Sequence, residues 1–205
     1  MISAPLRSAH RTLVVNTVGE PGSGKTTLSF WLSQALKRAG VLTEFVPEVV
    51  KYECFDPRGR ARVTSGRFDH RYLAQQTRLL RPLLGNVEVV VNDGAFELSY
   101  FYAQRRMDPP AAALFRERIE MLRRQTQVGV DSWFVMPRRE HPYESAGRNE
   151  SEAQALQVRE EMAQCLIDEF GVTIRPVGGD SDRAELADAI VAHVHAHRRN
   201  FSMSD

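Results

Sequence analysis

Short apolar runs alternate with longer amphipathic segments along most of this chain. The short runs are rich in β-branched residues and predict buried strands at residues 12–18, 41–46, 87–92, 132–136 and 172–177. Between them, apolar residues recur at helical spacing and predict helices at residues 25–39, 68–84, 96–106, 111–127, 151–170 and 182–198. Because strands and helices alternate, we predict a three-layer α/β fold in which a five-stranded parallel sheet carries helices on both faces.

Two segments show neither the apolar runs of a buried strand nor the spacing of an amphipathic helix. Residues 52–66 contain Gly, Pro and alternating arginines, and predict a surface loop or loose helix. Residues 137–150 are polar and lie between a predicted strand and a predicted helix, which indicates a small lid. A length of 205 residues predicts one domain, with a disordered tail at about residues 200–205.

The predicted helix boundaries rest on local signals. Ser151, with Gln154 three residues later, forms a capping box before the helix at residues 151–170. Asp182 precedes the last helical pattern and is predicted to cap it. Pro109 and Pro110 split the two helices predicted between residues 96 and 127.

Residues 19–26 read GEPGSGKT, a full match to the phosphate-loop pattern G-x-x-x-x-G-K-[ST], between a predicted strand and a predicted helix. Its glycines let the backbone curl so that amide N–H groups point at a bound phosphate, and the helix adds its positive dipole end. Lys25 would reach the β- and γ-phosphates, and the Thr26 hydroxyl would ligate Mg²⁺. The predicted nucleotide-binding residues are Gly19, Gly22, Ser23, Gly24, Lys25, Thr26 and Thr27, and the predicted cofactors are ATP and Mg²⁺.

Several phosphate-loop classes lack their signatures in this sequence. A Ras-like GTPase needs an N-K-x-D motif, and none of Lys25, Lys37 and Lys51 follows an asparagine. The LSGGQ-like signature of ABC-type ATPases is absent, and hexameric motor ATPases usually have longer domains. The pattern therefore favours a small phosphotransferase.

Acidic residues follow two predicted strands at the edge where open α/β sheets bind ligands. Asp93 follows the run at residues 87–92 and is predicted to hold Mg²⁺ directly or through water. Glu48 follows the run at residues 41–46, and we prefer it as the base for the acceptor hydroxyl, with Asp93 as the alternative. Arg138 and Arg148 in the lid are predicted to neutralise the transferred phosphoryl group.

The formal net charge of +1 hides an uneven distribution. Residues 51–71 and 104–124 each carry six basic residues against three acidic ones, whereas residues 144–188 carry eleven acidic residues against four arginines. Basic segments on the acceptor side favour a phosphate-bearing acceptor such as a nucleotide or DNA. The sequence shows neither a membrane-spanning run nor a secretion signal, and Cys54 and Cys165 fit reduced thiols, so we expect a cytoplasmic protein without a membrane partner.

Some aromatic and amide side chains are weaker candidates for base recognition. Gln75 or Gln76 could read a base edge, although a helix glutamine is more often solvated. Four aromatic residues could stack on a base, but core packing is the better interpretation for most of them. They are Tyr72, Phe96, Tyr100 and Phe101.

Three histidines near the C-terminus raise the question of a metal site. Only His193 and His197 share a helix face, because His195 lies between them. No further ligands are evident in the sequence, so we interpret the three as an exposed helix end.

Five motifs in this chain, GEPGSGKTTL, VPEVVKY, YLAQQTRLL, VEVVVND and HPYESAGRNESEAQAL, together span nearly its whole length. Through them the sequence resembles the nucleoside and nucleotide kinase branch of the phosphate-loop proteins, close to the ribosylnicotinamide-kinase type and related bacteriophage kinases. VPEVVKY is also similar to the Pro-Glu segment of deoxynucleoside kinases, whose glutamate acts as base, which supports Glu48. Deoxynucleoside kinases place an acidic-Arg-Ser triplet after the third strand, whereas Asp93 is followed by Gly94 and Ala95.

The resemblance implies an ATP-dependent kinase, and three hypotheses for its acceptor stay open. The leading one is a hydroxyl of a nucleobase or nucleoside, most specifically hydroxymethyluracil in DNA, in the host cytoplasm if the protein is phage-encoded. The second is a free nucleoside, a nucleoside monophosphate or ribosylnicotinamide. The third is an NTPase associated with nucleic acid that transfers phosphate only to water. By resemblance alone, adenine is expected near Gly178 and Gly179.

Overall fold

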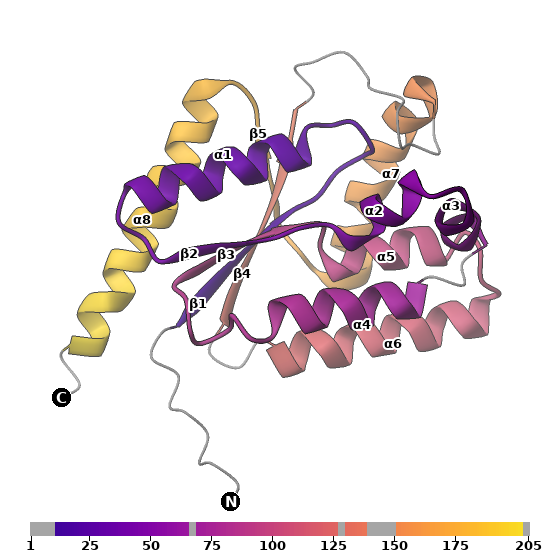
Figure 1. Cartoon of the computed structure of the whole chain (residues 1–205), viewed down its shortest axis with the longest axis horizontal. Helices are drawn as coiled ribbons and strands as arrows, with labels where there is room; N and C mark the ends of the chain where they lie inside the picture. Colours follow the sequence, from indigo (N-terminus) through magenta and orange to yellow (C-terminus); the bar gives the residue numbers. More distant parts are fainter. Residues whose placement is uncertain (1–10, 66–68, 127–129, 139–150, 203–205) are drawn as a thin grey trace, which may run out of the picture.

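The fold is that of a computed structural model, which describes residues 11–65, 69–126, 130–138 and 151–202 (Figure 1). The strands are β1 (Thr12–Thr17), β2 (Thr43–Val46), β3 (Val89–Asp93), β4 (Val130–Pro137) and β5 (Ile174–Val177). The helices are α1 (Lys25–Arg38), α2 (Val49–Phe55), α3 (Pro57–Thr64), α4 (Asp69–Leu80), α5 (Phe96–Ala103), α6 (Pro109–Thr126), α7 (Glu152–Phe170) and α8 (Asp180–Ser202).

The five strands form one parallel sheet in the order β2-β3-β1-β4-β5, which confirms the predicted fold class. The central strand β1 ends level with β3, because Thr17 pairs in register with Asp93, whereas β4 continues two residues past Val135, the partner of Thr17. Val46 of β2 pairs with Asn92. The segments that follow β1, β2 and β3 therefore leave the sheet at the same edge, where ligands bind in such folds.

Alternate strand residues bury two separate cores. Leu13 and Val15 of β1 pack on one face with α1 and α8, which lie together on that side of the sheet (Figure 1). Val14 and Val90 face the other side, where α4, α5, α6 and α7 pack. Because successive residues of a strand point to opposite faces, this two-sided burial explains why the strands are continuous apolar runs.

Residues 52–65 lie mostly in the helices α2 and α3, so of the two predicted alternatives, a loop or a loose helix, the structure favours the helix. The Asp56 carboxylate accepts a hydrogen bond from the Gly59 backbone N–H at 2.7 Å and so caps α3. Pro57 occupies the first turn, where its missing N–H costs nothing. Pro109 likewise begins α6 rather than lying between two helices, and Asp108 accepts from the Ala111 N–H at 2.8 Å.

The last two helices agree with the predicted pattern in part. The capping box of Ser151 and Gln154 is present at the start of α7. Helix α8 begins at Asp180, two residues before the predicted cap, and Asp182 instead accepts a hydrogen bond from the Gly178 N–H at 2.7 Å. It runs to Ser202, into the predicted tail, while residues 203–205 and most of the predicted lid lie outside the described residues.

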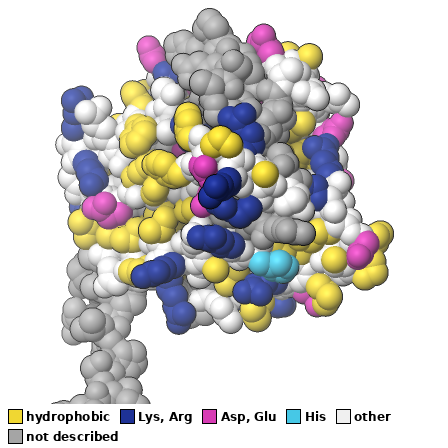
Figure 2. All heavy atoms as spheres, turned by 45° about the vertical axis from the view of Figure 1, so that its right-hand side comes forward, with side chains coloured by type: hydrophobic (Ala, Val, Ile, Leu, Met, Phe, Trp, Pro, Cys, Tyr) yellow, Lys and Arg dark blue, Asp and Glu magenta, His cyan; other side chains and the backbone are white. Residues whose placement is uncertain are grey.

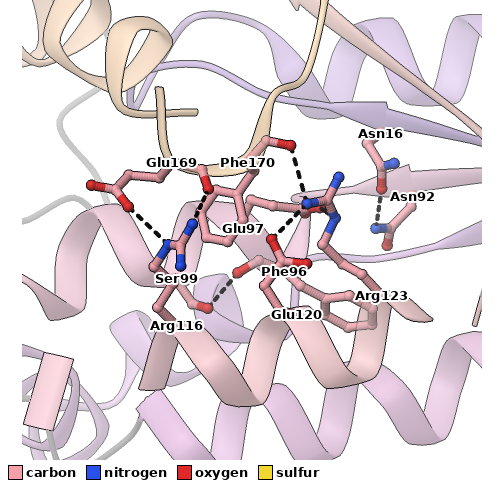
Figure 3. Close-up of polar contacts among 10 residues, drawn as sticks. All are labelled: Asn16, Asn92, Phe96, Glu97, Ser99, Arg116, Glu120, Arg123, Glu169 and Phe170. Carbon is pink, nitrogen blue, oxygen red and sulfur yellow. Dashed lines mark hydrogen bonds and ion pairs between the residues drawn. The ribbon is translucent and has the colours of Figure 1, made fainter. Parts of the chain in front are cut away.

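A buried ion pair ties α5 to α6 and to the end of α7 (Figure 3). Arg123 Nε lies 2.9 Å from Glu97 Oε1, and its Nη1 lies 3.0 Å from Glu120 Oε1 and 3.2 Å from the Phe170 carbonyl oxygen. Burial raises the pKa of the Glu97 carboxyl and outweighs the opposing attraction to Arg123. No helix among the described residues combines the length and apolar character that a bilayer crossing needs.

Candidate functional site

The predicted phosphate loop lies between the end of β1 and the start of α1. Gly24 caps α1 with φ of 92°, a left-handed conformation that glycine adopts without a side-chain clash. No side chain caps α1 by a hydrogen bond, and its first turn carries no acidic residue. The free N–H groups and the helix dipole therefore favour an anion at this position.

The ammonium group of Lys25 lies across the phosphate loop. Its Nζ donates to the carbonyl oxygens of Gly19 at 2.9 Å and Glu20 at 3.0 Å. The buried Ser23 hydroxyl has no hydrogen-bond partner among the residues that the structure describes. A cationic group and an unsatisfied hydroxyl in a loop of backbone N–H groups fit a bound phosphate chain.

Thr26 and Asp93, the two predicted metal ligands, are in direct contact. The Thr26 hydroxyl donates to Asp93 Oδ2 at 2.7 Å, and the Thr17 hydroxyl donates to Asp93 Oδ1 at 3.2 Å. Asp93 is 1% exposed. A carboxylate and a hydroxyl beside a phosphate loop form a donor set that fits Mg²⁺, which prefers oxygen ligands and phosphate.

A chain of buried amides holds the end of β3 that carries Asp93. Gln76 of α4 donates through Nε2 to Asn92 Oδ1 at 2.8 Å, and Asn92 donates through Nδ2 to Asn16 Oδ1 at 2.8 Å (Figure 3 shows the second bond). Asn92 also donates to the Gly94 carbonyl oxygen at 3.1 Å. The sequence suggested that Gln76 either recognises a base or is exposed to solvent. Gln76 is fully buried in the structure, so neither interpretation describes it.

Glu48 lies against Gly94, the residue that follows Asp93 in the chain. Gly94 has φ of +93°, and a Cβ built there would lie 3.2 Å from Glu48 Cγ and 3.4 Å from the Tyr72 hydroxyl oxygen. Only glycine leaves this space for the Glu48 side chain and adopts this backbone without strain. Burial raises the pKa of the Tyr72 phenol, and the negative charges of Glu48 and Asp93 raise it further.

A cavity of about 150 Å³ adjoins these groups. It is lined by Thr26, Phe30, Phe45, Pro47, Glu48, Lys51, Tyr52, Phe55 and Asp93. Phe30 is 57% exposed, Tyr52 67% and Phe55 61%, and the rings of Phe30 and Phe45 lie 4.6 Å apart. Exposed aromatic rings around an acidic group provide a surface on which a planar ligand can stack.

Sequence reasoning missed this aromatic cluster. The four aromatic residues singled out for stacking are all buried in the core, at 1–7% exposure, as the core-packing interpretation expected. Phe30 lies off the apolar face of α1, and this displaced position was the available signal. Tyr52 and Phe55 fell in the segment predicted as a surface loop or loose helix, so their common helix, α2, was not identified as an element of its own.

With this geometry established, comparison with known proteins places the chain. A family model described as an AAA domain, AAA_28, matches residues 14–184. The chain belongs to this family. No match was found among curated protein sequences.

The fold of this AAA_28 member also matches a solved structure, the crystal structure of NadR protein in complex with NAD and AMP-PNP. The TM-score is 0.57 at 17% sequence identity, and the match covers 90% of this chain but 50% of the NadR chain. The chain thus spans about half the length of that protein. At this identity the likeness establishes the fold alone, and it confirms the predicted three-layer α/β architecture.

The AAA_28 domain carries a further arginine beside its phosphate loop, one that sequence reasoning missed. Arg159 of α7 lies 3.3 Å from Glu20 Oε1 and donates to the Pro137 carbonyl oxygen at 3.3 Å. Glu20 is fully buried within the loop. The pair ties α7 to the loop, but Glu20 occupies a position where the motif allows any residue, so the sequence pattern carried no signal for it.

Of the two arginines predicted in the lid, the structure describes one. Arg138 follows β4, and its Cδ would lie 3.5 Å from a Cβ built at Gly178. Its N–H donates to the Val177 carbonyl oxygen at 2.7 Å, so this arginine lies beside the glycine pair predicted to be near adenine. Arg148 lies outside the described residues.

Much of the positive charge in residues 104–124 is used within the domain. Arg105 pairs with Glu161, Arg116 Nε lies 2.8 Å from Glu169 Oε2, and Arg123 is the half-buried partner of the buried Glu97. The acidic residues come partly from α7, so the basic and acidic segments neutralise each other in space.

Residues 51–71 keep more of their positive charge at the surface. Arg58, Arg60 and Arg71 are exposed. Figure 2 turns the side of the molecule that carries α3 forward, and Lys and Arg side chains gather there among hydrophobic ones. The charge of Arg62, by contrast, is neutralised within the segment, since this arginine pairs with Glu53 at 2.6 Å.

Proposed function

We propose that this chain is an ATP-dependent kinase that transfers a phosphoryl group to a hydroxyl of a nucleobase or nucleoside. One observation carries the proposal: Thr26 and Asp93 of the phosphate-binding end line the same cavity as Glu48 and four aromatic rings. A nucleotide-binding protein that only switches or hydrolyses has no need for such a second pocket. A kinase needs one, because donor and acceptor must meet in one site.

Residues at the phosphate loop would hold the donor. Lys25 would stabilise the charge on the transferred phosphoryl group, and Thr26 and Asp93 would hold Mg²⁺, which supplies charge neutralisation on the phosphates when bound. Arg138 and the glycine pair at residues 178–179 would take the adenine end. The Gly178 N–H donates to Asp182 Oδ2, and a Cβ built at Gly178 would lie 3.5 Å from Arg138 Cδ, so the glycine and this arginine lie side by side.

Glu48 is the proposed base. Each carboxylate oxygen of Asp93 already accepts a hydrogen bond from a threonine hydroxyl, which suits a metal-holding group. Glu48 lines the cavity beside it and would take the acceptor's proton as the acceptor oxygen bonds to the γ-phosphorus and ADP leaves. We therefore expect Glu48→Gln to lower kcat about 100-fold or more while the KM for ATP stays unchanged.

The aromatic lining supports a planar acceptor. A volume of about 150 Å³ suits a single base or pyridine ring rather than a whole nucleotide, and stacking on aromatic side chains is tolerant of ring type. The most specific acceptor that we propose is a hydroxymethylpyrimidine in DNA, flipped out of the double helix. Support comes from the exposed Arg58 and Arg60 on α3, which follows the helix that bears Tyr52 and Phe55.

A panel of acceptors distinguishes the alternatives. The protein is incubated with Mg²⁺ and γ-labelled ATP against free nucleosides, ribosylnicotinamide, nucleoside monophosphates, and DNA with or without hydroxymethyluracil. Label in the modified DNA alone is the expected result. Label in a small molecule but never in DNA would replace the DNA proposal with the free-nucleoside alternative, which the NAD in the NadR complex makes reasonable.

The pocket itself is tested by a pair of variants. Tyr52→Ala should raise the KM for the acceptor about 10-fold and leave the KM for ATP unchanged, because one stacked ring contributes about 1–3 kcal/mol. Leu114→Ala on α6 is the matched control, since Leu114 is similarly exposed at 66% but lies on a helix that does not line this cavity. An equal effect of both variants would remove the pocket from the proposal.

A second candidate is an NTPase that transfers phosphate only to water. The family description, an AAA domain, favours it, because that description names no acceptor. Release of all label as inorganic phosphate in the presence of every acceptor would support this candidate over the kinase.

A further inference from the structure

Three metal-ligating side chains meet at the end of the sheet away from the phosphate loop. Asp131 lies near the amino end of β4, and His193 and His197 lie one turn apart on α8. Asp131 Oδ2 is 3.1 Å from His193 Nε2 and 3.7 Å from His197 Nε2. One ligand atom from each of the three residues lies within 4.8 Å of the other two.

These separations match those of a preformed tetrahedral site. Two ligands that each lie about 2.0–2.1 Å from a tetrahedral Zn²⁺ are about 3.4 Å apart. The two measured oxygen-to-nitrogen distances fall on either side of that value. Only small side-chain shifts are therefore needed for all three atoms to reach one ion.

The orientation of the two rings also suits a metal. His197 donates through its Nδ1–H to the His193 carbonyl oxygen at 2.8 Å, which leaves Nε2 with the lone pair and turns it toward Asp131. The His193 ring packs edge-on against Trp133 at 5.3 Å between ring centroids, and 4.2 Å separates it from the His197 ring. Each ring is held by a contact that does not use its metal-facing nitrogen.

The geometry points to a Zn²⁺ site formed by Asp131, His193 and His197, with the fourth position open to water. Two imidazoles and one carboxylate form a donor set that zinc accepts. Arg11 lies 2.8 Å from the other carboxylate oxygen of Asp131, Oδ1, so it leaves Oδ2 for the ion. The guanidinium charge nearby would still weaken cation binding.

The consequence of this site is a link between α8 and the sheet. Leu186, Ile190 and Val194 of α8 pack in the same core as Leu28 and Leu32 of α1, the helix that begins at the phosphate loop. An ion that binds the folded chain alone stabilises it by mass action. Zinc would therefore stabilise the face of the domain that supports the phosphate loop.

The test is calorimetric titration of the metal-stripped full chain with ZnCl₂. We expect one Zn²⁺ per chain, and we expect His193→Ala and Asp131→Asn each to weaken that binding more than about 100-fold. His195→Ala is the matched control, because His195 is exposed on the same helix but is not among the three ligands, and it should change the Kd less than about twofold. Arg11→Gln should tighten binding, since it removes the competing cation.

Thermal unfolding gives a second readout for variants with altered stability. Saturating ZnCl₂ should raise the Tm of the wild type and of His195→Ala, and should leave the Tm of His197→Gln unchanged. The proposal is overturned if wild-type binding is weaker than millimolar. It is overturned equally if His193→Ala, His197→Gln and Asp131→Asn retain wild-type zinc affinity.

Discussion

Asp93 and Glu97 lie four residues apart, and both are almost completely buried, at 1% and 4% exposure. Their partners differ. Asp93 ends β3 and accepts hydrogen bonds from the hydroxyls of Thr17 and Thr26, whereas Glu97 begins α5 and faces the guanidinium of Arg123. A buried carboxylate that has only neutral partners can be neutralised by a metal ion, and one that already has a fixed cation cannot accept another.

The contrast between Asp93 and Glu97 separates a predicted catalytic role from a structural role within one short segment of the chain. The Glu97 pair joins α5, α6 and the end of α7, so its effect is on the fold (Figure 3). The Asp93 cluster joins the phosphate loop to the cavity, so we predict that its effect is on chemistry. Burial and charge alone do not distinguish these roles, and the identity of the partner does.

The largest effect is expected from Asp93→Asn. An amide can still bond both threonine hydroxyls, one of which would then accept from the amide nitrogen, but it holds Mg²⁺ poorly. We therefore expect kcat to fall about 100- to 1,000-fold with little change in Tm. Glu97→Gln is the comparison variant and should retain activity per folded molecule. Steady-state kinetics and thermal unfolding on both proteins test this, and a similar loss of kcat in the two variants would erase the distinction.

The next effect is on stability. Arg123→Met leaves the Glu97 carboxylate buried without its cation, and should lower the unfolding free energy by about 3–5 kcal/mol. The double variant Glu97→Met with Arg123→Met should recover most of that loss, because it replaces the buried pair with apolar groups. Urea denaturation measures both. If the double variant is no more stable than the single one, the pair does not act as a unit.

A smaller effect is expected from Gly94→Ala, since φ of +93° costs an L-residue about 1–2 kcal/mol. The added Cβ also meets the Glu48 side chain, so kcat should fall about 10-fold as well. Gly171→Ala is the matched control: it has φ of +62° and no neighbouring atom within 4 Å of its built Cβ. It should lose stability but not activity, and a normal kcat in Gly94→Ala would argue against the placing of Glu48.

The smallest effect is a dependence of stability on pH. Because burial raises the pKa of Glu97 above its ordinary value of 4.5, the folded protein binds more protons than the unfolded chain between 4.5 and the raised value. The unfolding free energy contributed by this group should therefore fall as pH rises through that window. Denaturation of wild type and Glu97→Gln at several pH values from about 4 to 8 reads it out. A difference between the two proteins that stays constant with pH would contradict it.

The layers of the fold and the phosphate loop were predictable because they depend on local sequence. Strands buried on both faces must be continuous apolar runs, and the loop must place its glycines, Lys25 and Thr26 at fixed spacings. The positions of Asp93 and Glu48 also followed, since Asp93 ends β3 and Glu48 follows β2, and these two strands end at one edge of the sheet. Their roles in catalysis remain predictions that the kinetics above would test.

What could not be predicted depends on contacts between segments far apart in the chain. Asp131 and His193 are separated by 62 residues, and nothing local marks them as neighbours. The partner of the buried Glu20 is likewise a distant residue, Arg159 on α7, which the local sequence does not indicate. The pairing of Arg105, Arg116 and Arg123 with acidic side chains that fold against them was likewise not visible in the sequence of residues 104–124.

The most direct test of the central claim is where the γ-phosphate goes. Wild type and Lys25→Ala are incubated with Mg²⁺, γ-labelled ATP and the acceptor panel, with Lys37→Ala as the control because Lys37 is an exposed lysine paired with Glu44. The account predicts label in an organic acceptor for wild type and Lys37→Ala, and almost none for Lys25→Ala. Label found only in inorganic phosphate, with every acceptor present, would contradict it.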